Sequence, residues 1–154
     1  MLHGLMSYGR IINDIRSHFG DLLGISGVQY EILMAVQRLE GEEGVSVSDV
    51  ANWIRRSPVF VTNEVKALVK HRLVEKRKSN SDGRKVLLRL TNIAEKQVAD
   101  LAPSQRNVND ILFEDMSAEE FETLVDVITR LLPCGDRALG TLGAQLHNNK
   151  ISPN

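Results

Sequence analysis

The chain has 154 residues, of which 42% are hydrophobic and 25% are charged, and its formal net charge is −1 at pH 7. This length predicts one architectural unit with a sizeable core and excludes two large domains. No apolar run approaches the 18 residues of a membrane span and the first residues do not resemble a signal peptide, so we expect a cytoplasmic protein.

The N-terminal segment predicts a helix with one apolar stripe. Its apolar residues are spaced alternately by three and four positions, which places them on one face: Leu5, Tyr8, Ile12, Ile15, Phe19 and Leu22. Such a stripe needs a partner, which is either the core of the same chain or a second subunit. Gly24 breaks the pattern, and Ser26 with Gln29 forms a capping box that starts a second helix.

A short third helix is predicted after the acidic loop 40–44. Ser46 supplies a capping side chain and Asp49 an acid at the positive end of the helix dipole. The helix is expected to end near residues 55–56 and to turn three side chains inward: Val50, Trp53 and Ile54.

The fourth helix is predicted to begin at Ser57 and Pro58, because proline at the first helical position loses no hydrogen bond. One face is a core stripe of Val61, Val65 and Leu68. The opposite face carries Val59, Thr62, Asn63, Lys66 and Lys70. These side-chain types read thymine methyls, base edges and phosphates in a major groove, although a merely solvated face would have a similar composition.

Two short β-prone runs, 73–78 and 85–90, flank a polar loop and predict a hairpin. Apolar and mostly basic positions alternate in the second run, so that one face, with Val86, Leu88 and Leu90, can pack while the other stays basic. The order helix, turn, helix, hairpin is that of a winged helix-turn-helix, with the hairpin as its wing.

The positive charge is concentrated in this part of the chain. Residues 55–89 hold 11 Lys and Arg and 3 Asp and Glu, a balance of +8, whereas the remainder sums to −9 (8 minus 17). A basic block in an otherwise acidic molecule is typical of a nucleic-acid reader. The DNA contacts that we expect come from Ser57, Pro58, Val59, Thr62, Asn63, Lys66, Lys70, Arg77, Lys78, Asp82, Gly83, Arg84 and Lys85. Arg84 is expected to reach the minor groove from the wing tip, with Asp82 orienting its guanidinium.

The C-terminal part is predicted to be helical. Thr91 caps a long helix that runs toward Met116, and a second capping box begins at Ser117. The helix that follows is expected to turn inward the side chains of Phe121, Leu124, Val125, Ile128, Leu131 and Leu132. Pro133 is expected to close it, leaving residues 134–154 as a weakly ordered tail or a short helix.

The chain resembles the multiple antibiotic resistance regulator (MarR) family over nearly its whole length. The motifs that carry the resemblance are Ser57-Pro58 with Val61-Thr62 and Leu68, and the wing pattern Asp82-x-Arg84 followed by Leu90-Thr91. Asn63 stands where many relatives have arginine, and Ala94 replaces a frequent glycine. The resemblance implies a mainly α fold with a small β-hairpin wing, divided into a DNA-binding domain at 26–91 and a helical dimerisation region at 1–24 and 92–133.

The function implied by this resemblance is a homodimeric regulator, usually a repressor, that binds a palindromic operator and is released by a small aromatic or phenolic ligand. The residues expected at the dimer contact are Leu5, Tyr8, Ile12, Ile15, Phe121, Leu124, Ile128 and Leu131. Pockets favour junctions between domains, so the residues expected near an effector are Tyr8, Ile12, Arg16 and Tyr30.

Other functions are disfavoured or remain open. The four histidines lie far apart, and the chain has no Gly-rich phosphate loop and no nucleophile elbow, so we expect no enzyme, metal or cofactor. The single cysteine, Cys134, allows no intramolecular disulfide, in agreement with a reducing compartment. An architectural protein that coats DNA without sequence choice would share the basic block, and a winged helix that binds proteins instead of DNA stays possible.

Overall fold

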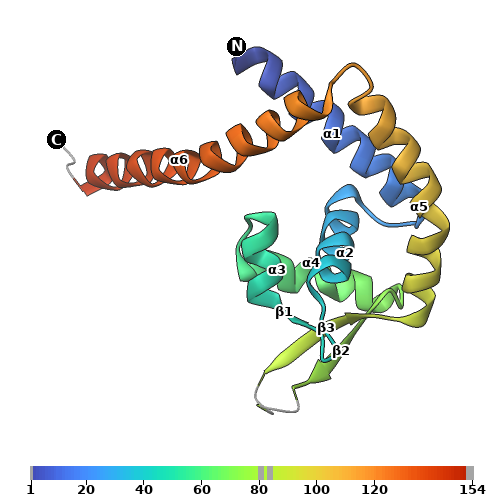
Figure 1. The fold of residues 1–154 in the computed structure, drawn as a ribbon. Coiled ribbons are helices and arrows are strands. Elements are labelled where there is room, and N and C mark those ends of the chain that lie inside the picture. The colour runs from blue at the N-terminus through green and yellow to red at the C-terminus, as the bar shows by residue number, and fades with distance from the viewer. Residues whose placement is uncertain (1, 80–81, 83–84, 152–154) are drawn as a thin grey trace. The chain divides into compact units, whose positions relative to one another are not determined.

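The computed structural model describes residues 2–79, 82 and 85–151, with side chains up to residue 146 (Figure 1). In chain order the described elements are α1 (Leu2–Leu22), α2 (Gly27–Leu39), β1 (Val45–Ser46), α3 (Val47–Ile54), α4 (Pro58–Lys70), β2 (Val74–Lys78), β3 (Val86–Leu90), α5 (Asn92–Leu112) and α6 (Ala118–Ile151). The mainly helical fold with a small hairpin is confirmed. The chain divides into two compact units, Met1–Ala102 and Pro103–Asn154, and α5 passes from one to the other.

The core of the first unit lies between α2, α3, α4 and the sheet. The predicted inner face of α4 is confirmed, because Val61, Val65 and Leu68 are completely buried. α1 packs on α2, where the rings of Phe19 and Tyr30 stack with their centroids 5.6 Å apart. Helices α1, α2 and α3 therefore pack together with the inner face of α4 and the inner end of the hairpin.

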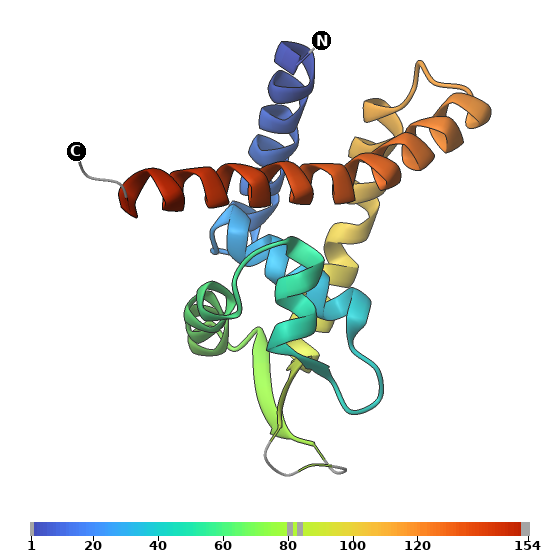
Figure 2. The ribbon, with the colours of Figure 1, turned by 90° about the vertical axis from the view of Figure 1, so that its left-hand side faces the viewer.

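Three short strands form an antiparallel sheet in the order β1-β3-β2. The predicted hairpin is confirmed, with a register from Val74 opposite Leu90 to Lys78 opposite Val86. Sequence reasoning missed β1, which has only two residues and no periodic pattern of its own. Figure 2 shows β2 and β3 extending away from the helices of this unit.

Serine side chains start the helices as predicted. The Ser26 hydroxyl accepts a bond from the Gln29 N–H at 3.2 Å, and the Gln29 side chain accepts one from the Ser26 N–H at 3.1 Å. Ser46 caps α3 in the same way, by accepting from the N–H of Asp49. Such caps satisfy amide groups that have no partner within the helix.

Two predicted inward side chains are instead exposed. Trp53 is 57% exposed, because the buried face of α3 is centred on Val50, Ala51 and Ile54 and Trp53 lies beside that face. Val86 is 47% exposed, since it lies at the outer end of the hairpin, beyond the core that covers Leu88. The hairpin therefore packs only at its inner end.

The predicted end of the last helix at Pro133 is wrong, because α6 continues through Pro133 to Ile151. Of the two alternatives expected for the residues after it, a weakly ordered tail or a short helix, the structure agrees with the helical one as far as Ile151. An interior proline removes one backbone bond at a cost of about 3 kcal/mol, which does not prevent helix on both sides. Apolar residues continue at helical spacing beyond it, at Leu139, Leu142 and Leu146. α5 likewise contains Pro103 in its interior.

The start of α6 has the predicted capping box. Glu120 accepts bonds from the Ser117 N–H at 2.8 Å and from the Ser117 hydroxyl at 2.7 Å. These bonds favour the charged carboxylate and lower the pKa of Glu120 from its ordinary value.

The apolar side chains of α6 are not turned inward within one chain. The exposed ones are Phe121, Val125, Ile128, Leu131 and Leu132. The expectation that these side chains turn inward is therefore wrong within a single chain, and the expected dimer contact at Phe121, Leu124, Ile128 and Leu131 stays a prediction. None of the described helices is both long and apolar enough to cross a membrane.

Candidate nucleic-acid interface

The candidate reading helix, α4, begins at a tight turn. Arg55 adopts a left-handed conformation with φ 57°, which ends α3 and redirects the chain within three residues. The Ser57 hydroxyl then accepts a bond from the N–H of Phe60 at 3.2 Å, and Pro58 occupies the first turn. The Arg56 guanidinium lies over the Phe60 ring at 5.6 Å, so cationic groups gather at the helix start.

The outer face of α4 presents the predicted side chains. Val59 is 71% exposed and Asn63, Lys66 and Lys70 are exposed, whereas Thr62 is half-buried. The Thr62 hydroxyl donates to the Pro58 carbonyl at 2.8 Å. The Lys66 ammonium donates to the Asn63 side-chain oxygen at 3.1 Å. This bond holds the Asn63 amide in one orientation, and a two-point contact of that amide with adenine requires the oxygen to accept a second bond.

The hairpin carries the second group of predicted contacts. Lys78 and Lys85 are exposed at its outer end. Arg77 is paired with Glu75 two positions before it on the same face of β2, and both side chains are exposed. Lys76 is exposed in the same strand, and sequence reasoning overlooked it although it belongs to the basic block.

The predicted wing tip is described only in part. Asp82 is half-buried, its N–H donates to the Ser79 hydroxyl at 3.4 Å, and its carbonyl accepts from the Lys85 N–H at 2.8 Å. Gly83 and Arg84 lie outside the described residues, so the contact between Asp82 and Arg84 and the minor-groove role of Arg84 stay predictions.

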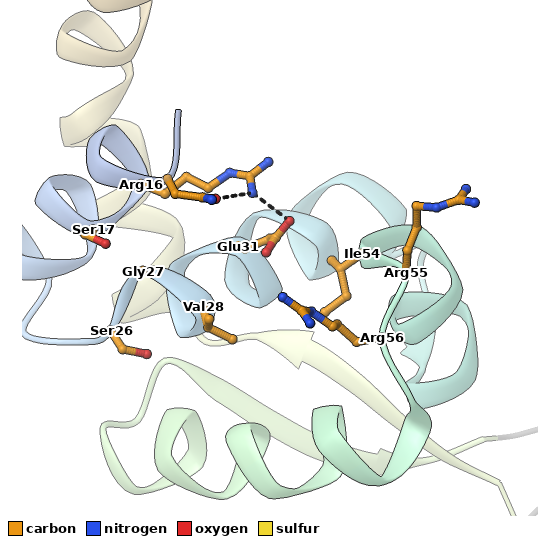
Figure 3. A pocket seen from close by; sticks show the side chains of 10 residues that line it. Arg16, Ser17, Ser26, Gly27, Val28, Glu31, Ile54, Arg55 and Arg56 are labelled. Carbon is orange, nitrogen blue, oxygen red and sulfur yellow. Dashed lines mark hydrogen bonds and ion pairs between the residues drawn. The ribbon is translucent and has the colours of Figure 1, made fainter. Parts of the chain in front are cut away.

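The residues expected near an effector are separated by the structure. Arg16 lines a cavity of about 660 Å³ between α1, α2 and the end of α3, where its guanidinium lies 3.0 Å from the Glu31 carboxylate (Figure 3). Tyr8 and Ile12 are not among the lining residues, and Tyr30 is buried against Phe19. The cavity is also lined by Arg55 and Arg56, which sequence reasoning did not associate with a ligand.

A comparison with protein families bears on this segment. Residues 23–85 match the model described as the MarR family. The matched range contains every predicted DNA contact from Ser57 to Lys85, so the family resemblance is confirmed where the interface lies. No curated protein sequence matches the chain.

Solved structures with a MarR-family description share the fold. A MarR protein from Peptoclostridium difficile is 16% identical with a TM-score of 0.75, covering 92% of this chain and 90% of its own. The transcription regulator MarR from Oenococcus oeni is 18% identical with a TM-score of 0.74, covering 86% and 99%. The S. aureus MepR–DNA complex is 19% identical with a TM-score of 0.72, covering 86% and 93%. At these identities the likeness establishes the winged helix fold.

Among residues whose side chains are described, no group of three His, Cys, Asp or Glu could hold a metal ion. The exposed side chains on the outer face of α4 are those of Val59, Asn63, Lys66 and Lys70. They offer one aliphatic group, one amide and two ammonium groups.

Proposed function

We propose that the chain is a DNA-binding transcription regulator that chooses its sites by base sequence, with α4 as the reading helix in the major groove. The observation that carries this proposal is the division of α4 into a fully buried face and an opposite face that presents Val59, Asn63 and Lys66. Exposed aliphatic, amide and ammonium groups on one helix face can read a thymine methyl, a base edge and a phosphate together. The S. aureus MepR–DNA complex, whose protein has a similar fold, supports DNA binding.

The proposed roles follow from exposure and pairing. Val59 contacts a thymine methyl, and Asn63, held by Lys66, contacts an adenine edge. Lys70, Lys78 and Lys85 neutralise phosphates. Ser57 and Pro58 set the direction of α4, and Arg84 enters the minor groove. Arg77 contributes less to phosphate binding, since Glu75 is already its partner.

We propose that the protein acts as a homodimer held together by α1 and α6. Large apolar side chains are exposed along both helices, including Leu5, Tyr8, Phe121, Ile128 and Leu131. Ile12, Ile15 and Leu124 are only half-buried. A continuous stripe of exposed apolar side chains usually marks a surface that binds another protein. Two reading helices about 34 Å apart would require an operator that is an inverted repeat.

Repression with release by a small ligand is the regulatory part of the proposal. The cavity at Arg16 combines three arginines with one carboxylate, Glu31, so its charge favours an acidic ligand, and the family resemblance implies that the ligand is aromatic. An incoming carboxylate would compete with Glu31 for Arg16, and a compound that binds one arrangement of α1 and α2 better than another would shift their balance. A thermal-shift assay with aromatic acids tests this part. We expect stabilisation of the native protein and not of Arg16→Gln.

The alternative function is an architectural protein that binds DNA without sequence choice. The two are separated by incubating the purified protein with fragmented genomic DNA of its own source and sequencing the bound fragments. The proposal predicts a few discrete loci that disappear with Asn63→Ala. Uniform coverage that is insensitive to this substitution would establish the architectural function instead.

A further inference from the structure

The acidic loop between α2 and β1 is bonded to the hairpin at several points. The Glu40 carboxylate accepts from the Leu90 N–H at 2.8 Å. The Glu43 carboxylate accepts from the Ser79 hydroxyl at 3.2 Å. The Glu42 backbone carbonyl accepts from the Arg89 guanidinium. The loop residues lie 36 to 50 positions before their partners, so these bonds fix the hairpin to the helical core rather than shaping it locally.

The bonds hold opposite ends of the hairpin. Leu90 is the last residue of β3, next to the core, whereas Ser79 directly follows β2 at the outer end. Ser79 also donates its N–H to the Lys85 carbonyl at 3.0 Å, where the described ladder ends. A hairpin attached only at its inner end can pivot about that point, while attachment at both ends fixes its tilt.

The position of Glu43 matters because of the strand order. β1 pairs with β3 and not with β2, so the sheet gives β2 no direct link to the strand at Val45. Glu43 stands two residues before Val45, and its side chain reaches Ser79 beyond the end of β2. Ser79 is 7% exposed whereas Glu43 is exposed, so the bond is shielded from water on the Ser79 side only.

We propose that Glu43, through Ser79, is a positioning residue that sets the placement of the wing on DNA. The inference rests on the proposed function. The direction in which DNA affinity changes when Glu43 is removed distinguishes this role from a simple effect of charge. Removing a carboxylate near DNA strengthens binding if only charge counts, because the repulsion of phosphates falls. Loss of the bond to Ser79 weakens binding, because the wing must then be ordered when DNA binds.

The test compares four substitutions by titration of a duplex selected from random DNA. Glu43→Ala is expected to weaken binding about tenfold, about 1.4 kcal/mol. Ser79→Ala is expected to weaken binding at least as much, because it also removes the bond that the hydroxyl accepts from the Asp82 N–H, and the double variant is expected to be no weaker than Ser79→Ala. Glu43→Gln keeps an acceptor for the Ser79 hydroxyl and is expected to bind like the native protein or tighter. Glu42→Ala is the matched control, since it removes the same charge while its bond to Arg89 is made by the backbone.

Two further readouts distinguish positioning from general damage. Hydroxyl-radical footprints of Glu43→Ala are expected to lose protection at the flanks of the site and keep it at the centre, where α4 binds. Hydrogen exchange of the free variant is expected to be faster at Arg77 and Lys78 and unchanged in α4. Equal binding by Glu43→Ala and Glu42→Ala, or uniform loss of protection, would overturn the inference. If the native protein shows no preference among duplexes, the proposed function is wrong, and so is the positioning role of Glu43.

Discussion

The dependence of DNA affinity on salt follows from the number of exposed cations on the interface. Among the predicted DNA contacts that the structure describes, four lysines per subunit remain after Arg77 is set aside as paired with Glu75: Lys66, Lys70, Lys78 and Lys85. A dimer would then neutralise about eight phosphates, and log K is expected to fall with log salt at a slope of about −7. Between about 50 and 200 mM salt, affinity is expected to fall by about 10⁴.

The substitution Lys78→Gln tests this count. It removes one contact from each subunit and is expected to make the slope less steep by about 1.8. Arg106→Gln is the control, because it removes an equally exposed charge from α5 outside the interface and leaves the slope unchanged. Fluorescence anisotropy with a labelled duplex at four or more salt concentrations measures both. A slope near zero, or equal slopes for the two variants, would refute the reasoning.

Three further predictions concern stability. Ser57→Ala removes the cap of α4 and is expected to lower the free energy of unfolding by about 1 kcal/mol in urea titrations; an unchanged midpoint would contradict the cap. Leu88→Ala, at a fully buried position, is expected to lower the free energy of unfolding by about 2–5 kcal/mol. Val86→Ala, at an exposed position, is expected to lower it by under about 0.5 kcal/mol. Similar losses for the two variants would contradict the difference in burial. The pKa of Glu120 is lowered in the folded protein, so the bonds of its carboxylate stabilise the start of α6 above the ordinary pKa and are lost as the pH falls through the folded pKa. Glu120→Gln is therefore expected to make the helix content, measured by circular dichroism, less sensitive to acid. Equal acid titration curves for the variant and the native protein would contradict this role.

Local signals in the sequence predicted much of the fold. Ser26, Ser46 and Ser57 each fix a helix start, because a capping hydroxyl acts within three residues of its own position. The alternating pattern around Leu88 similarly identified the hairpin. Helix caps and periodic apolar patterns can be recognised in the sequence because each involves residues that are only a few positions apart.

Features that depend on distant parts of the chain were harder to predict. Trp53 lies at helical spacing compatible with burial, and only the packing around Ala51 leaves it outside. Pro133 signals a helix end by itself, yet the segments on both sides continue the helix. The bond between Glu43 and Ser79 joins residues 36 positions apart and has no pattern in the sequence. The pairing of Arg77 with Glu75 could have been predicted, since residues two apart on a strand share a face.

Selection of bound duplexes from randomised DNA tests whether two copies of the chain read DNA through α4. We expect enrichment of an inverted repeat whose half-sites are about 10 base pairs apart, centre to centre. We also expect Asn63→Ala to lose the preference for adenine at one position within each half-site. Recovery of unrelated sequences, or of a single unrepeated motif bound by one chain, would contradict reading by two copies.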